Sequence, residues 1–191
     1  MAKEPQLKAS VVNPGMSFIS SSLGEAAFNS ILAAFDSREI AGKRLLPSAW
    51  VSEKTYHDLL VATGKYLAST PGQRQPKEFF FEMGRFAGTE GVNKYYKSLI
   101  RMFDTKFMLA RSTFIWGLTH THGSVKAEAI GKTGAYVYVN DFPTPCKEFC
   151  YSMAGYMYAI GELTKAQMIR VEELECVMEG AKRCKYIGEW K

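Results

Sequence analysis

Three cysteines and a glutamate near the C-terminus are the residues best suited to chemistry. Cys150, Glu173, Cys176 and Cys184 fall close together in a chain of 191 residues. Three thiolates and a carboxylate, four ligands in all, suit a tetrahedral Zn²⁺ ion. Four protein ligands leave no open position for a reacting water molecule, so a zinc ion held by these residues is predicted to be a structural cofactor rather than a catalytic ion.

A second ligand set uses Cys146 in place of Glu173. Cys146 and Cys150 are four residues apart, so on a helix they would share one face. A site of four cysteines is chemically reasonable for the same ion. In a third interpretation the four cysteines of the chain are buried thiols that bind nothing. Spacing alone leaves all three interpretations open.

The elements that must position these residues are one helix and a pair of strands. A helix is predicted over 145–160, after Pro145, and strands over 167–177 and 182–190. Positions three apart on a regular strand face opposite sides of the sheet. Glu173 and Cys176 can therefore share one metal ion only if a bulge or the end of the strand redirects one of them.

Hydrophobic periodicity predicts the rest of the chain. We expect helices from residue 22, from residue 53 and over 79–103, and strands over 106–117, 124–130 and 134–140. Helices followed by strands, then a helix and a final strand pair, indicate an α+β fold. It would combine N-terminal helices, an antiparallel sheet with helices packed on it, and a C-terminal helix plus β-hairpin joined by the metal site.

Residues 1–20 are polar and punctuated by proline and glycine, so we expect an N-terminal extension or a short strand there. Residues 21–191 are predicted to form one domain. The net charge of +5 comes from interspersed lysine, arginine, aspartate and glutamate, which disfavours a nucleic-acid partner. Without a secretory signal or an apolar span of about 18 residues, a cytoplasmic protein with no membrane partner is expected.

The C-terminal spacing resembles the signature of the 4-vinyl reductase-type domain. The matching residues are Cys150-x4-Gly155-Tyr156, followed by Glu173-x2-Cys176-x3-Gly180-x3-Cys184. That family belongs to the superfamily of nitric-oxide-signalling and Golgi-transport ligand-binding folds. It is similar to the sensor domains of aromatic-responsive bacterial activators, in which such a Cys/Glu/Cys/Cys set holds structural zinc. Residues 45–145 more weakly resemble a myxobacterial paralogous family of unknown function.

The resemblance implies an apolar ligand pocket between helices and sheet, often in a homodimer. We interpret Trp116, Tyr136 and Tyr138, on expected middle strands, as candidates to line that pocket. The chain departs from the activators in the segment 136–141, so phenol recognition is not carried over. The Tyr-x-Ser-x-Arg haem-contacting motif of the gas sensors is absent from the sequence, and the histidines are interpreted as structural or solvated.

Taken together, these features favour a zinc-stabilised domain that binds a small hydrophobic or aromatic molecule and acts in sensing or regulation. It would work through a homodimer or a partner protein. The alternative is a protein-interaction adaptor related to transport-complex subunits. A reductase-type enzyme ranks last, because the sequence has no dinucleotide fingerprint and no recognisable set of catalytic residues; we therefore expect no enzymatic activity.

Overall fold

The computed structural model describes residues 4–43, 45–95, 104–164 and 166–191, and gives no side-chain detail for 92–95. The N-terminal half is helical apart from two short strands. In chain order its elements are β1 (Gln6–Lys8), α1 (Ala9–Leu23), α2 (Glu25–Leu32), β2 (Trp50–Ser52), α3 (Glu53–Ser69) and α4 (Pro76–Tyr95). Strands β1 and β2 pair antiparallel, so α1 begins beside Ala49, before β2, and α3 begins beside Pro5, before β1.

The C-terminal half carries the main sheet. Its elements are α6 (Thr105–Ala110), α7 (Ser112–Thr119), β3 (Ser124–Ile130), β4 (Gly134–Asn140), α8 (Lys147–Leu163), β5 (Met168–Glu175), the 3₁₀ turn η1 (Val177–Glu179) and β6 (Cys184–Trp190). The strand order is β3-β4-β6-β5, with every neighbouring pair antiparallel. The predicted α+β fold with an antiparallel sheet and a C-terminal helix plus hairpin is confirmed.

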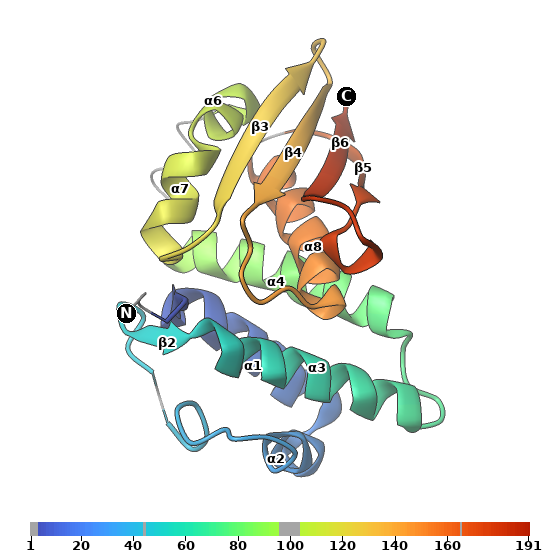
Figure 1. The fold of residues 1–191 in the computed structure, drawn as a ribbon. Helices are drawn as coiled ribbons and strands as arrows, with labels where there is room; N and C mark the ends of the chain where they lie inside the picture. Colours follow the sequence, from blue (N-terminus) through green and yellow to red (C-terminus); the bar gives the residue numbers. More distant parts are fainter. Residues whose placement is uncertain (1–3, 44, 96–103, 165) are drawn as a thin grey trace.

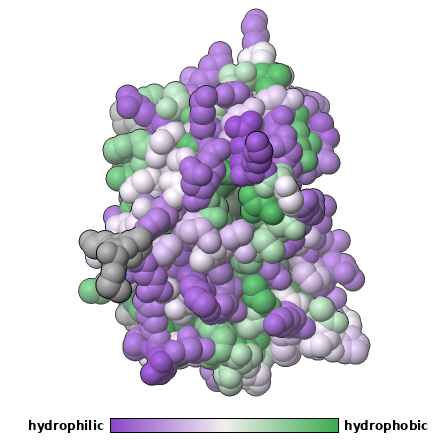
Figure 2. Space-filling model, viewed as in Figure 1, coloured by the Kyte–Doolittle hydropathy of each residue, from purple (hydrophilic) through white to green (hydrophobic). Residues whose placement is uncertain are grey.

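Helices cover one face of this sheet. Figure 1 shows α8 behind the strands, α6 and α7 beside β3, and α4 running between the sheet half and helices α1 to α3. The other face is open to solvent, and Figure 2 shows that hydrophilic side chains cover most of it, with smaller hydrophobic areas among them. The core therefore lies between the sheet and the helices. Within the described ranges no helix is long and apolar enough to cross a membrane.

Helices α4 and α8 pack closely because glycines meet the opposite backbone. A Cβ atom added at Gly84 would lie 1.8 Å from the carbonyl oxygen of Ser152, and one at Gly155 would lie 1.8 Å from that of Phe81. Real Cβ atoms do not approach oxygen so closely, so only glycine fits at these two positions. The crossing matters for function because α8 carries Cys150 and also contributes to the sheet-facing core.

The predicted strand over 106–117 is wrong, because this segment forms helices α6 and α7. Asp104 caps α6 by accepting a hydrogen bond from the backbone N–H of Phe107 at 2.8 Å. The apolar residues in this segment occur on several sides of the helices, and most are half-buried or exposed. That distribution hides the helical period, and packing against β3 decides the conformation.

The N-terminal segment also differs from expectation. The short strand expected within residues 1–20 exists as β1, but Ala9 then begins a helix that runs through Pro14 to Leu23. Gly24, with φ of +85°, separates this helix from α2, so the helix expected from residue 22 begins instead at Glu25. The helices predicted from 53 and over 145–160 are confirmed, as are the strands at 124–130 and 134–140. The part of the predicted 79–103 helix at 96–103 lies outside the described residues.

Candidate functional site

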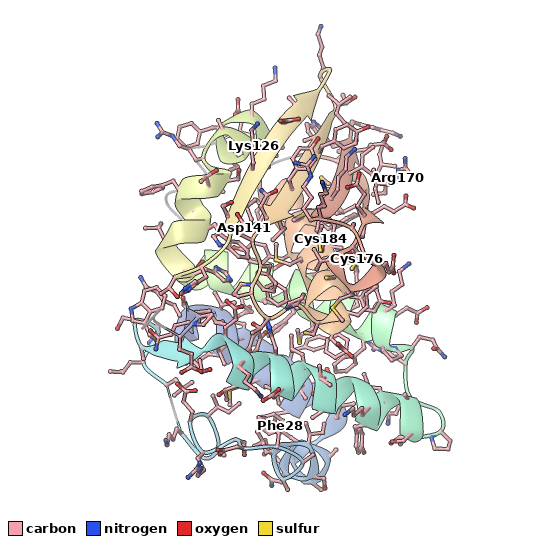
Figure 3. The ribbon with its side chains drawn as sticks, viewed as in Figure 1. Phe28, Lys126, Asp141, Arg170, Cys176 and Cys184 are labelled. Carbon is pink, nitrogen blue, oxygen red and sulfur yellow. The ribbon has the colours of Figure 1, made fainter. Side chains whose placement is uncertain are left out.

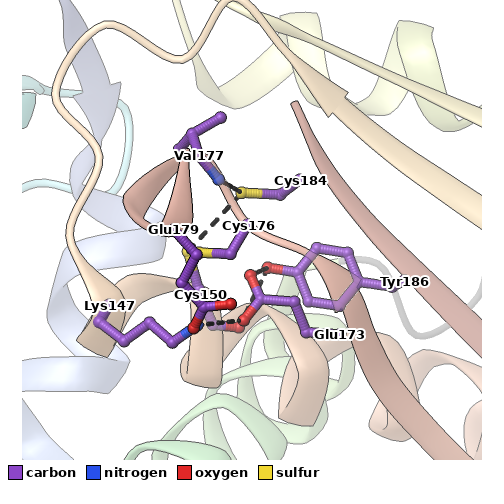
Figure 4. Close-up of polar contacts among 8 residues, drawn as sticks. All are labelled: Lys147, Cys150, Glu173, Cys176, Val177, Glu179, Cys184 and Tyr186. Atoms are coloured by element: carbon purple, nitrogen blue, oxygen red, sulfur yellow. Dashed lines mark hydrogen bonds and ion pairs between the residues drawn. The ribbon is translucent and has the colours of Figure 1, made fainter. Parts of the chain in front are cut away.

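The structure brings the four predicted ligands together. Cys150 comes from α8, Glu173 from β5, Cys176 from the residue after β5, and Cys184 from the start of β6. One ligand atom from each residue lies within 4.8 Å of all the others. The Sγ atom of Cys150 is 3.8 Å from both the Sγ of Cys176 and the Sγ of Cys184. Figure 3 places Cys176 and Cys184 side by side at the end of the sheet, and Figure 4 shows the whole cluster.

An irregularity in β5 lets Glu173 and Cys176 face the same point. The pairing of β5 with β6 shifts register between Glu173 and Glu175. Cys176 lies beyond the strand and begins the 3₁₀ turn, which Gly180 closes with φ of +89°. The sequence required a bulge or a strand end between Glu173 and Cys176, and the structure has both.

Cys146 lies outside this group. It is buried at the N-cap of α8 with an extended backbone, φ −140° and ψ 151°. Because Cys146 precedes the first helical residue, it does not share a helix face with Cys150 as the sequence suggested. Cys146 is instead packed near Tyr56, so the structure favours Glu173 over Cys146 as the fourth member of the cluster.

Neighbouring groups fix the cluster and set its charges. Lys147 Nζ lies 2.9 Å from Glu173 Oε2, and Val177 donates its backbone N–H to Cys184 Sγ at 3.5 Å. A hydrogen bond from the Cys150 thiol lowers the pKa of Cys184 to about 7, and the same bond together with burial raises the pKa of Cys150. Burial also raises the pKa of Cys176. Binding of a metal ion here would therefore release protons.

The cluster borders a surface groove that gives access to it. The groove has a volume of about 960 Å³ and runs between α4, α8 and β5. Cys150, Glu173 and Lys147 form part of its wall, together with several glutamates and the side chains of Phe81 and Tyr151. An ion could enter by this route without unfolding of the hairpin.

A second cavity, which we call the apolar pocket, lies between the helices and the covered face of the sheet. Its volume is about 500 Å³, within the range of small-molecule sites. Its wall comes from α1, α3, α4, α6, α7, α8 and all four strands of the main sheet. Representative lining residues are Val11, Tyr56, Ile115, Trp116, Val125, Val137, Phe149, Met153, Met157 and Trp190.

Of the three residues predicted to line a ligand pocket, the structure places one in this wall. Trp116 lines the apolar pocket, on a helix rather than the expected strand. On β4, Ala135 and Val137 face the pocket, so the alternating residues Tyr136 and Tyr138 face the other side of the sheet. There Lys185 Nζ lies 4.0 Å from the ring centroid of Tyr136, and Arg183 Cζ lies 4.1 Å from that of Tyr138.

His120 is a buried wall residue, which corrects its interpretation from the sequence as part of a solvated hairpin end. It follows α7, is 9% exposed, and stacks on Trp116 with ring centroids 3.7 Å apart and planes 6° apart. Burial lowers the pKa of His120 to about 3, so the ring is neutral at pH 7. The sequence Thr-His-Thr-His at 119–122 is typical of a solvated hairpin end, and nothing in it reveals that Leu7 of β1 pairs with His120.

A buried polar group joins the N-terminal helices to the sheet half. Thr144 donates its hydroxyl to Glu53 Oε1 at 2.6 Å, and its carbonyl oxygen lies 2.5 Å from His57 Nδ1. Glu53 and His57 are almost completely buried. Burial raises the pKa of Glu53 and lowers that of His57 to about 4. We call Glu53, His57 and Thr144 the seam. Because burial shifts the pKa values of Glu53 and His57, proton binding by these two side chains is coupled to the packing of the seam.

Comparisons with known proteins identify the fold. No family model matches the chain, and no curated protein matches it. Solved H-NOX structures do match. An H-NOX protein from S. oneidensis in its Fe(II)NO state is 14% identical, covers 97% of this chain and 99% of its own, and has a TM-score of 0.69. A mutant H-NOX of T. Tengcongensis is 13% identical, covers 97% and 98%, and has a TM-score of 0.70.

An oxygen-binding H-NOX domain related to soluble guanylate cyclases, solved with oxygen, is 13% identical over 97% of this chain and 95% of its own, with a TM-score of 0.67. At such low identity the likeness establishes a shared fold and nothing finer. The solved neighbours thus support the general fold expected from the sequence. They do not support the more specific resemblance to 4-vinyl reductase-type and zinc-containing sensor domains.

The prediction of structural zinc as the cofactor is corrected by the same comparisons. The solved neighbours are described as proteins with haem, with NO bound to Fe(II) or with bound oxygen, and these descriptions do not name zinc. The thiol and carboxylate cluster by itself is a possible metal site with no identified ion. Its chemistry suggested zinc because thiolates and carboxylates are common zinc ligands, but this donor set does not specify one metal.

Proposed function

We propose that this chain is a sensory or regulatory domain that binds a small apolar molecule in the apolar pocket. The observation that carries the proposal is the pocket itself, a partly open cavity of about 500 Å³ between helices and sheet in a fold shared with gas-binding H-NOX proteins. Filling such a cavity with apolar surface is favourable by about 25 cal/mol per Å² buried. A ligand would contact both halves of the molecule at once.

The walls of the pocket suggest how occupancy could be sensed. Ile115, Trp116 and Phe114 on α7 all line the pocket, and Phe114 is also 64% exposed at the surface. A ligand that moves the inner side of α7 therefore also moves residues at the surface. We propose that this surface change is passed to a second copy of the chain or to a partner protein, and that the domain itself catalyses no reaction.

Haem is the group that the fold neighbours carry. To bind haem, the apolar pocket of this chain would have to supply an axial ligand and partners for the haem carboxylates. An axial ligand is conceivable, because His120 lines the pocket and its Nε2 atom has no partner. The two haem carboxylates need cationic partners, and the described lining residues provide one, Arg111, which lies over the ring of Phe107 at 5.6 Å. The haem-contacting motif is also absent from the sequence. The residues present do not fit haem, and we propose a metal-free organic ligand.

A binding assay with the hydrocarbon fluorophore diphenylhexatriene tests the proposed function. The wild-type protein should enhance its fluorescence with saturable, one-to-one binding. Val137→Trp, which fills the pocket from β4, should abolish binding, whereas Tyr136→Ser on the opposite face of the same strand should leave it unchanged. Equal binding by both variants would place the dye elsewhere and remove the support for the pocket. A Soret band in the purified protein would show that haem binds after all.

We further propose that Cys150, Glu173, Cys176 and Cys184 bind one metal ion of a thiolate-preferring type. The support is the mutual approach of their ligand atoms within 4.8 Å. Elemental analysis by mass spectrometry should find one ion per chain in wild type and in Cys146→Ser, and a reduced amount in Glu173→Gln. Loss of metal from Cys146→Ser with retention in Glu173→Gln would show that the ligand set is wrong.

A further inference from the structure

Strand β5 has an edge that no other described strand covers. The strand order β3-β4-β6-β5 places β3 and β5 at the two edges of the main sheet. Helices α6 and α7 pack against β3, whereas β5 lies at the rim of the sheet in Figure 1. In an edge strand, alternate backbone N–H and C=O groups point away from the neighbouring strand and can pair with another chain.

The surface groove beside the cysteine–glutamate cluster runs along this edge. Five consecutive residues of β5, 171–175, line the groove together with residues of α4 and α8. Side chains of a strand alternate between the two faces of the sheet, so a cavity on one face alone would meet every second residue. Contact with five residues in a row indicates that the groove opens onto the edge of the strand. One of the five, Leu174, is a large apolar side chain with 46% of its surface exposed.

Glutamates dominate the charge of the groove. Its wall contains six glutamates and three basic residues, Arg74, Lys77 and Lys147. The glutamates are Glu78, Glu82, Glu172, Glu173, Glu175 and Glu179. Lys147 is already held by two of them, at 2.9 Å from Glu173 and 2.6 Å from Glu179. The groove therefore has an excess of negative charge.

Two of these glutamates lie opposite β5 with no ion pair of their own. Glu78 and Glu82 are one turn apart on α4, on the other side of the groove from the strand. Neither forms an ion pair within 4.0 Å among the residues that the structure describes, whereas Glu172 and Glu175 both have basic partners. Cationic side chains brought into the groove would complement this wall.

We propose that the groove binds an extended, basic segment of a partner protein, which adds a strand to the main sheet at the edge of β5. Its backbone would pair with β5, and its lysine or arginine side chains would face Glu78 and Glu82. A second copy of β5 fits less well, because the three glutamates within that strand would bring like charges opposite one another. This inference rests on the part of the proposed function in which the domain acts through a partner, and it specifies that partner's chemistry.

The experiment uses a capped peptide of alternating lysine and valine, as long as β5. Calorimetric titration at low ionic strength should show binding to the wild-type protein that weakens as salt is added. The double variant Glu78→Lys/Glu82→Lys should bind at least about tenfold more weakly. The control is Glu25→Lys/Glu90→Lys, which makes the same change of charge at two exposed positions outside the groove and should keep most of the affinity.

Two further measurements need no variant. N-methylation of two adjacent central amides in the peptide removes a hydrogen-bond donor from each of its edges and leaves its charge unchanged, so this peptide should lose binding. In ¹H–¹⁵N spectra of the wild-type protein, the parent peptide should shift the amide resonances of β5 and leave those of β3 in place.

Equal binding of the parent and N-methylated peptides, equal weakening in the two double variants, or no response of the β5 amides would overturn the inference. So would a dimer in sedimentation whose β5 amides are protected from hydrogen exchange without peptide, because a second copy would then hold the edge. Diphenylhexatriene separates this inference from the pocket. If the wild-type protein binds the dye and not the peptide, the pocket stands and the partner surface fails; if it binds the peptide and not the dye, the pocket fails.

Discussion

The cysteine–glutamate cluster and the apolar pocket lie on two sides of helix α8 and are built in opposite ways. The cluster draws four polar side chains from residues 150–184 to within 4.8 Å of one another. The pocket draws its wall from residues between Ser10 and Trp190, and nearly all of that wall is apolar. The cluster thus joins one helix to the neighbouring hairpin, whereas the pocket forms only where the two halves of the chain pack together.

The difference shows how strongly each site depends on the rest of the fold. The hairpin of β5 and β6, with its bulge, fixes three of the four cluster residues by local pairing. The pocket needs β1 to hold His120, α4 to hold α8, and α7 to cover β3. Perturbations of stability should therefore reach the two regions to different degrees.

The largest effect is expected from breaking the cluster. Cys184→Ser removes a thiolate that faces Cys150 and accepts from Val177, and with it most of the binding free energy of the proposed ion. The free energy of unfolding should fall by about 4 kcal/mol or more, measured by chemical denaturation. Cys146→Ser, which changes a buried cysteine outside the cluster, should cost far less. Equal losses in the two variants would show that the cluster has no special role.

The next largest effect should come from Gly155→Ala, which separates α8 from α4 and so disturbs both regions. The new methyl carbon would lie 1.8 Å from the carbonyl oxygen of Phe81, and backbone must move to relieve the clash. We expect a loss of about 3 kcal/mol in thermal or chemical unfolding. Gly117→Ala, where the added carbon meets nothing within 4 Å, is the matched control and should be close to neutral.

Acid should destabilise the seam and the pocket through their histidines. The pKa is about 4 for His57 and about 3 for His120 in the folded protein, both below the value of about 6.5 in an unfolded chain. The unfolded state therefore binds more protons between pH 6.5 and 4, and stability should fall as pH decreases through that window. The fall is partly offset by Glu53, whose raised pKa acts in the opposite direction.

Replacing His57 tests whether buried histidines of the seam, and not histidines nearer the surface, cause this pH dependence. His57→Gln should flatten the stability profile between pH 6.5 and 4, because one buried titrating ring is gone. His122→Gln, which alters a half-buried histidine, is the control and should leave the slope nearly unchanged. A profile of wild-type slope in His57→Gln would mean that other groups govern acid unfolding.

The smallest effect is expected on ligand affinity alone. Trp116→Leu removes an indole from the pocket wall and should weaken diphenylhexatriene binding about tenfold, equivalent to about 1.4 kcal/mol. Tyr138→Ser alters the opposite face of the sheet, where Arg183 covers the ring, and should leave the affinity unchanged. If Tyr138→Ser weakened binding as much as Trp116→Leu, the assignment of the pocket face would be wrong.

The two regions also differ in how far the sequence could predict them. Spacing identified the candidate ligands, with Glu173 and Cys146 as alternatives for the fourth, and required a bulge or a strand end between Glu173 and Cys176; the register shift at that point meets the requirement. Strands at 124–130 and 134–140 followed from alternation, and the helix from Glu53 followed from its period. Residues 106–117 and 9–23 were missed because the local patterns there are ambiguous, and contacts with β3 and α4 determine their conformation.

The sequence by itself determined the α+β class, the C-terminal hairpin and the set of residues that could bind a metal ion, because side-chain chemistry and short-range periodicity encode these features. Only the tertiary structure decided that Glu173 rather than Cys146 completes the cluster, that Tyr136 and Tyr138 face away from the pocket, and that His120 lies buried in its wall. Each of those outcomes depends on which distant segments pack together, and pairings such as Leu7 with His120 leave no signal in local spacing.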